Sequence, residues 1–120
     1  MAWGNCYIYK IVNVVNTKIY VGKAADIRIR WQQHQREARA NKKRHLPLYR
    51  DMHDYGIDKF SIEQIDVCVY DHTHLVKELY WIEYYDCAYP NGYNIEVTGR
   101  RKAYKQYPEY RCQDEQWNTL

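Results

Sequence analysis

An acidic side chain falls within the apolar stripe of a segment that has helical spacing. In residues 72–86 the apolar side chains of Leu75, Leu79 and Ile82 recur at helical intervals, and Glu78 lies between them. Helical geometry therefore puts this carboxylate on or beside the buried face. Such burial is costly unless the carboxylate is paired or binds a metal ion. The pattern leaves two readings open. One is an internal salt bridge to an arginine, and the other is a magnesium site completed by water and a substrate phosphate.

A second pair of reactive side chains lies in the segment that precedes this helix by some forty residues. Arg30 and His34 are spaced i, i+4, so on a helix they project from the same side. Arginine binds phosphate bidentately and stays charged, while histidine can accept, donate or orient a water molecule. The pair predicts a phosphate site, although a solvated basic face with His34 at its edge gives the same spacing.

Charge is distributed unevenly along the chain, although the net charge of +3 is small. Residues 51–96 hold ten acids against two lysines, whereas the segment from Arg100 to Arg111 is basic again. Residues 28–50 contain one acid, Glu37, and eight basic side chains: Arg28, Arg30, Arg36, Arg39, Lys42, Lys43, Arg44 and Arg50. Basic segments on both sides of an acidic one favour a phosphate-binding surface beside a metal-binding carboxylate.

The elements that must position these residues follow from periodicity and turn signals. Alternating β-branched and aromatic residues predict strands at 6–13 and 18–22, and Gly22 marks a bend or a close approach. Asp26 is a predicted N-cap for a helix to about residue 40, and Pro47 begins a shorter helix that Gly56 ends. The remaining predicted elements are a strand at 60–70, the helix at 72–86, and a short extended piece at 93–95. This order predicts an α/β (α+β) sandwich, a small three-stranded antiparallel sheet flanked by helices.

Composition adds two limits. The chain has fourteen Tyr and four Trp but one Phe, a balance that suits stacking on nucleic acid and equally suits a small tyrosine-rich core. Its four cysteines are scattered without a Cys-x-x-Cys pair, which argues against a structural zinc site. The longest apolar runs are far below the ~20 residues of a membrane helix, so no membrane partner is expected.

Five sequence elements, in order, resemble the GIY-YIG endonuclease superfamily. The two tripeptides that name this family resemble Tyr7-Ile8-Tyr9 and Tyr20-Val21-Gly22 on the two predicted strands. The family's arginine, the residue one turn later, the helical glutamate and the asparagine of a Gly-Tyr-Asn turn match Arg30, His34, Glu78 and Asn94. Tyr7 replaces the family's first glycine and Val21 its second isoleucine, and both are compatible with a strand. The resemblance implies the GIY-YIG nuclease fold over residues 1–98, with residues 99–120 as a basic tail.

The resemblance also implies a function: hydrolysis of DNA phosphodiester bonds with one divalent metal ion. In that scheme Glu78 binds Mg²⁺, for which Mn²⁺ can substitute, and Arg30 stabilises the charge of the transition state. Tyr9 or Tyr20 activates the attacking water, and the sequence does not say which. Lys23 is expected to lower the pKa of that tyrosine, and His34 to help position water or phosphate.

Other residues have supporting roles in the same scheme. Asn94 supports the site structurally, and His45 resembles a further histidine of homing endonucleases. Side chains expected to contact nucleic acid are Arg28, Lys42, Lys43 and Arg44. A homodimer or a separate specificity subunit would supply target choice, and the expected location is the cytoplasm of a bacterial or phage-infected cell, or its nucleoid. The alternatives are a catalytically weak nucleic-acid-binding module acting with a partner and, third, a small protein-interaction domain.

Overall fold

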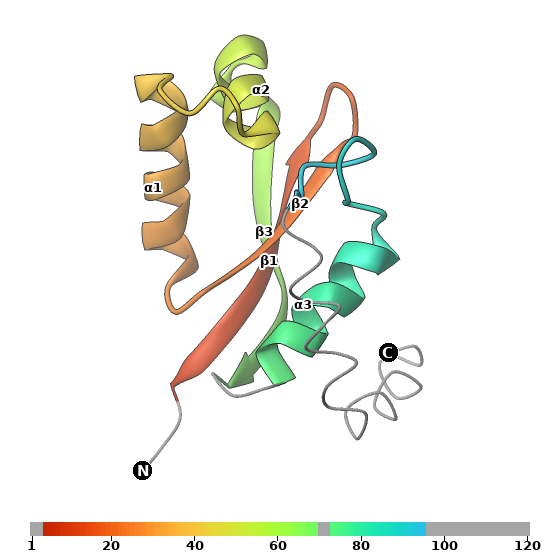
Figure 1. Ribbon diagram of the computed structural model, residues 1–120. Coiled ribbons are helices and arrows are strands. Elements are labelled where there is room, and N and C mark those ends of the chain that lie inside the picture. Colours follow the sequence, from red (N-terminus) through yellow and green to blue (C-terminus); the bar gives the residue numbers. More distant parts are fainter. Residues whose placement is uncertain (1–3, 70–72, 96–120) are drawn as a thin grey trace.

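The computed structural model describes residues 4–69 and 73–95 of the 120-residue chain (Figure 1). In chain order, its strands and helices are β1 (Asn5–Asn13), β2 (Ile19–Ala24), α1 (Ile27–Ala40), α2 (Pro47–Tyr55), the 3-10 turn η1 (Ile57–Lys59), β3 (Phe60–Val69) and α3 (Thr73–Tyr84). The three strands form one antiparallel sheet in the order β2-β1-β3. The predicted three-stranded sheet flanked by helices is therefore confirmed.

The helices cover opposite faces of this sheet, with α1 and α2 on one side and α3 on the other (Figure 1). Two separate clusters of buried side chains fill the layers. Tyr9 and Ile11 of β1 pack with α1 and α2, while Ile8 packs with Leu79 and Ile82 of α3. This division follows from the alternation of side chains along a strand, because successive residues point to opposite faces.

The ends of α1 and α2 are set by the residues that the sequence suggested. The carboxylate of Asp26 accepts a hydrogen bond from the amide of Ile29 at 3.1 Å and caps the first turn of α1. Pro47 occupies the start of α2, and Gly56 ends it with φ of 103°, a left-handed value that favours glycine. Both helices therefore begin and end close to their predicted bounds.

β2 lies at an edge of the sheet and differs from its prediction in one respect. It continues through Gly22 to Ala24, so the glycine is an internal strand residue. Its outer edge is met by the segment after α3: the amide of Tyr93 donates to the carbonyl of Ile19 at 3.0 Å. Within the described ranges, no helix has the length and apolar content that crossing a bilayer requires.

Candidate active site

A close approach between two strands builds the floor of the site. Tyr9 of β1 stands directly opposite Gly22 of β2, and the Tyr9 ring is completely buried. A Cβ atom at Gly22 would lie 2.5 Å from the Tyr9 hydroxyl and 2.8 Å from the Tyr20 ring. Glycine is therefore required here, because only a residue without a side chain lets both phenols lie over β2. The sequence signal of a close approach at Gly22 is confirmed, and its cause is the pair of tyrosines.

His34 of α1 joins two phenols through its two ring nitrogens. Its Nε2 atom hydrogen-bonds with the Tyr9 hydroxyl at 2.7 Å, and its Nδ1 atom hydrogen-bonds with the Tyr49 hydroxyl at 2.9 Å. Burial, reinforced by the positive charge of Arg30, lowers the pKa of His34 to about 3. The ring is therefore neutral at pH 7. A neutral imidazole donates from one nitrogen and accepts at the other, so one phenol donates to it and the other accepts from it.

Burial acts on the tyrosines in the opposite sense. It raises the pKa of Tyr9 well above its ordinary value, reinforced by Tyr20 and opposed by Arg30. Burial also raises the pKa of Tyr49, again opposed by Arg30. Tyr9 and Tyr49 therefore stay protonated at neutral pH and act as hydrogen-bonding partners of His34.

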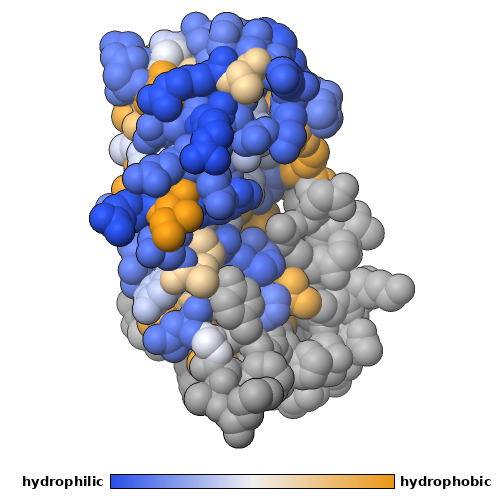
Figure 2. Space-filling model, turned by 90° about the vertical axis from the view of Figure 1, so that its left-hand side faces the viewer, coloured by the Kyte–Doolittle hydropathy of each residue, from blue (hydrophilic) through white to orange (hydrophobic). Residues whose placement is uncertain are grey.

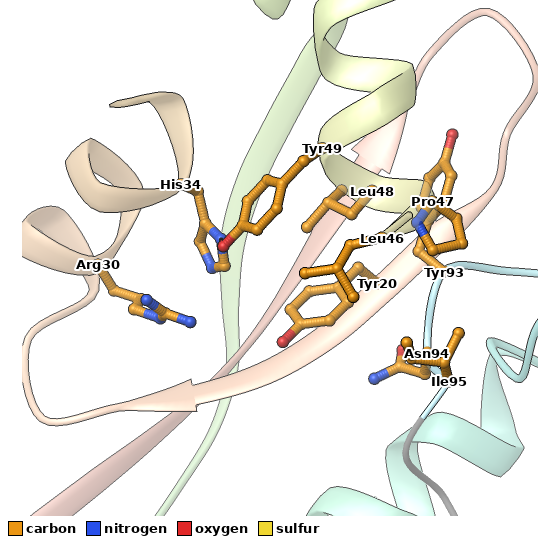
Figure 3. A pocket seen from close by; sticks show the side chains of 10 residues that line it. All are labelled: Tyr20, Arg30, His34, Leu46, Pro47, Leu48, Tyr49, Tyr93, Asn94 and Ile95. Carbon is orange, nitrogen blue, oxygen red and sulfur yellow. Dashed lines mark hydrogen bonds between the residues drawn. The ribbon is translucent and has the colours of Figure 1, made fainter. Parts of the chain in front are cut away.

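A cavity of about 270 Å³ lies beside the hydrogen-bonded residues Tyr9, His34 and Tyr49 (Figure 3). Arg30 and His34 reach it from α1, Tyr20 from β2, and Tyr49 from α2. The remaining lining residues are Leu46, Pro47, Leu48, Tyr93, Asn94 and Ile95. Its lining includes the Arg30 guanidinium and the Tyr20 phenol, which can bind and orient a phosphate, whereas both ring nitrogens of His34 and the side-chain amide of Asn94 are bonded within the protein. The sequence prediction that Arg30 and His34 project together is confirmed.

The predicted carboxylate lies on the other face of β2, in the first turns of α3. Glu78 is 2% exposed, as its position in the apolar stripe predicted. Its Oε1 atom accepts from the Nζ atom of Lys23 at 3.0 Å. Of the two readings that the sequence left open, the internal salt bridge is present, with a lysine of β2 as the partner and not an arginine. Neither Glu78 nor Lys23 is among the residues that line the cavity of Figure 3.

The residues after α3 secure the free edge of β2. The side-chain amide of Asn94 pairs with the backbone of Val21, donating to its carbonyl at 2.8 Å and accepting from its N–H at 2.9 Å. The Tyr93 hydroxyl donates to Asp51 of α2 at 2.8 Å and accepts from the amide of Asn13 at 3.1 Å. These bonds tie β2, β1 and α2 together. Asn94 thus supplies hydrogen-bond partners to the backbone of an edge strand, which is a physical reason for the supporting role expected of it.

The predicted basic residues fall into different environments. Lys43 pairs with Glu37 at 2.9 Å, and Arg44 is held by two hydrogen bonds to Asp54 at 2.8 and 2.9 Å. Arg28 and Lys42 are exposed. His45 lies in the loop before α2 and lines no cavity described for this part of the chain.

One residue of the site was missed from the sequence. Tyr49 lies fifteen residues after His34 and on another helix, and it completes the hydrogen-bonded chain to the buried imidazole. Its place at the third position of the helix that begins at Pro47 was the available signal, but fourteen tyrosines in the chain made it inconspicuous.

The donor set of the site suits a hard divalent cation. Among the described residues, no group of three His, Cys, Asp or Glu side chains could hold a metal ion by itself. Magnesium typically binds one or two carboxylates and completes its shell with water and substrate phosphate. Glu78 is a buried carboxylate of this kind, and a metal ion bound there would have to displace the Lys23 ammonium or share the carboxylate with it.

Comparisons with known proteins agree with this architecture. Residues 5–94 match the family model of the GIY-YIG catalytic domain. Intron-associated endonuclease 1 of Enterobacteria phage T4 is 30% identical over 89 residues, which cover 73% of this chain and 36% of that protein. The chain thus spans about a third of the length of this relative.

Solved structures of one catalytic domain are also similar. That of the homing endonuclease I-TevI superposes with a TM-score of 0.66 at 28% identity, covering 75% of this chain and 97% of that one. A glutamate-to-alanine mutant of the same catalytic domain superposes with a TM-score of 0.68 at 27% identity, covering 78% and 96%.

Proposed function

The chain belongs to the GIY-YIG family of catalytic domains, and from that premise we propose that it is an endonuclease that hydrolyses phosphodiester bonds of DNA with one divalent metal ion. The observation that carries the proposal is the cavity in which Arg30, Tyr20 and the neutral imidazole of His34 meet. Arg30 offers a fixed positive charge to one phosphate and Tyr20 a hydroxyl, while the buried carboxylate of Glu78 is bonded to Lys23 of the same strand as Tyr20.

Arg30 is the proposed phosphate ligand. Its Nη1 atom donates to the side-chain oxygen of Gln33 at 3.0 Å, which orients the guanidinium from α1. A guanidinium presents two parallel N–H groups to phosphate oxygens and cannot lose its charge at neutral pH. Charge that develops on those oxygens in the transition state therefore meets a preorganised cation.

Tyr20 is the proposed contact of the attacking water. It lines the cavity, whereas Tyr9 is completely buried, bonded to His34, and has a raised pKa. A water molecule can reach only the hydroxyl that faces the cavity. A phenol needs a nearby positive charge to become a base, and Arg30 supplies one in the same cavity. Tyr9, His34 and Tyr49 support Tyr20 from below. The ring of Tyr20 lies edge-on to that of His34, with 5.7 Å between the ring centroids.

Glu78 is the proposed ligand of Mg²⁺, with Mn²⁺ as a substitute. When bound, the metal ion supplies Lewis-acid stabilisation of the phosphate and leaving oxygen. Lys23 neutralises the carboxylate in the metal-free chain and holds its Oε1 atom in place. Without a cationic partner, burial of this carboxylate would be costly.

Plasmid cleavage tests this function. The chain is incubated with supercoiled plasmid in Mg²⁺ or in EDTA, and we expect nicked or linear product in Mg²⁺ alone. Tyr20→Phe should lower the cleavage rate by about 10²–10⁴-fold with unchanged folding, since it removes a proton-handling group. Tyr9→Phe is the matched control and should lower the rate less. Equal losses in the two variants would refute the assignment of Tyr20. If the chain cuts neither DNA nor single-stranded RNA, the nuclease function is refuted.

A further inference from the structure

A second cavity adjoins the first and is lined by α1, the loop that follows it and the start of α2. Its volume is about 440 Å³, and it shares Arg30, Leu46 and Tyr49 with the cavity of Figure 3. Its other lining residues are Gln33, Arg36, Glu37 and Lys43. Because three residues line both cavities, the two lie side by side, and the side chain of Arg30 borders each of them.

The lining of this second cavity is cationic. Arg30, Arg36 and Lys43 carry positive charges against the single carboxylate of Glu37. No ion pair within the described residues involves Arg36, so its guanidinium is available to a ligand. Figure 2 shows the side of the molecule on which α1 lies, where hydrophilic side chains cover most of the surface.

The Lys43–Glu37 pair can open to admit an anion. Its Nζ–Oε2 distance is 2.9 Å, but the side chains are 49% and 35% exposed. Exposed pairs of this kind contribute little to stability, because water and salt screen them. A phosphate that offers Lys43 an equivalent bond therefore displaces Glu37 at little cost.

A polynucleotide carries phosphates in series. When one of them binds Arg30, the next along the strand lies close by, and the adjoining second cavity is a cationic site that could receive it. Resting on the proposed nuclease function, we propose that the second cavity binds the phosphate next to the scissile one, through Arg36 and Lys43. Gln33 and Glu37 are positioning residues: Gln33 bonds Arg30, and Glu37 holds Lys43 until the strand arrives.

This assignment separates side chains that are equivalent in the sequence. Lys43 lines the cavity, while its neighbour Lys42 does not. Arg44 is bound to Asp54 through two hydrogen bonds and lies outside the lining as well. Of the three consecutive basic residues, Lys43 is therefore the one that contacts a DNA phosphate in the proposed site.

The test is DNA binding in EDTA, so that cleavage plays no part. The affinity for a short fluorescein-labelled duplex is measured by anisotropy over a range of salt concentrations. Each lost phosphate contact lowers the slope of log K against log[salt] by about 0.9. We expect that loss in Lys43→Gln and in Arg36→Gln, about twice that loss in the double variant, and an unchanged slope in the matched control Lys42→Gln. Circular dichroism verifies that each variant is folded.

A change of opposite sign gives a second readout. Glu37→Gln releases Lys43 and should tighten binding, and it should do so more than Glu63→Gln, which removes the acid of another surface pair, Lys10–Glu63. Equal slopes for the Lys43 and Lys42 variants, or no binding of the duplex at all, would overturn the inference. If the slopes differ as expected but plasmid is never cut with metal, the phosphate site stands and the nuclease fails. If plasmid is cut but the salt slopes of Lys43→Gln and Lys42→Gln are equal, the nuclease stands and the phosphate site fails.

Discussion

Replacing Gly22 with alanine puts a methyl group where the Tyr9 hydroxyl lies. The added Cβ would be 2.5 Å from the Tyr9 Oη atom, 2.6 Å from its Cζ atom, and 2.8 Å from Cε2 of Tyr20. Tyr9 cannot turn away freely, because it is completely buried and its hydroxyl is bonded to His34 at 2.7 Å. The substitution must therefore displace both phenols of the site or push β2 away from β1.

Two opposing terms set the magnitude. Overpacking of a filled core costs about 1–3 kcal/mol. Replacing glycine by alanine where the backbone permits it stabilises by about 0.4–1 kcal/mol, because the unfolded chain loses freedom. The overpacking term is larger at this site, so we expect a net loss of about 1–2 kcal/mol. At about 4 °C per kcal/mol, the melting temperature should fall by about 4–8 °C.

The assay is urea unfolding followed by tryptophan fluorescence, with Gly4→Ala as the matched control. A Cβ at Gly4 would meet no atom within 4 Å, so this variant should be neutral or slightly stabilised. Plasmid cleavage by Gly22→Ala should also fall, because Tyr20 loses its position. If Gly22→Ala is as stable as Gly4→Ala and equally active, the proposed packing of the two tyrosines over β2 is wrong.

Two further predictions concern the buried polar groups around this site. The folded pKa of His34, about 3, lies below its unfolded value of about 6.5, so only the unfolded chain binds a proton between these pH values. Stability should therefore be independent of this group above pH 6.5 and fall as pH drops below it, by about 2–3 kcal/mol at pH 4.5. His34→Gln should lack that loss in urea titrations, whereas the exposed His53→Gln should retain it. Asn94→Ala leaves the N–H and carbonyl of Val21 without their side-chain partners, which costs about 1–3 kcal/mol per buried group. The free energy of unfolding should therefore fall by about 2–4 kcal/mol. The control Asn91→Ala should change it little. Equal stability of the two asparagine variants would show that the Asn94 pair does not hold the edge of β2.

Local pattern was enough to predict the elements and part of the site. The i, i+4 spacing put Arg30 and His34 on one side of α1, and the apolar stripe of α3 put Glu78 in the interior. Caps and breakers such as Asp26 and Gly56 act within a few residues of themselves, so the sequence reveals them directly. The family tripeptides added the two strand segments that carry Tyr9 and Tyr20.

What the sequence did not reveal depends on contacts between distant segments. The bond from His34 to Tyr49 joins two helices, and the pairing of Asn94 with Val21 joins residues far apart in the chain. The partner of Glu78 was expected to be an arginine, but side-chain alternation along β2 turns Lys23 toward α3. Likewise, no periodicity distinguishes Lys42 from Lys43 in a loop.

The central claim is that Glu78 binds the metal ion of a nuclease site. The most direct test compares the wild-type chain with Glu78→Gln for conversion of supercoiled plasmid to nicked or linear DNA in Mg²⁺. Circular dichroism and DNA binding in EDTA serve as controls that the variant is folded and engages substrate. We predict cleavage by the wild type and its loss in Glu78→Gln, with folding and binding retained. Cleavage by a folded Glu78→Gln at the wild-type rate would contradict the assignment of the carboxylate, and binding without cleavage by either protein would contradict the nuclease.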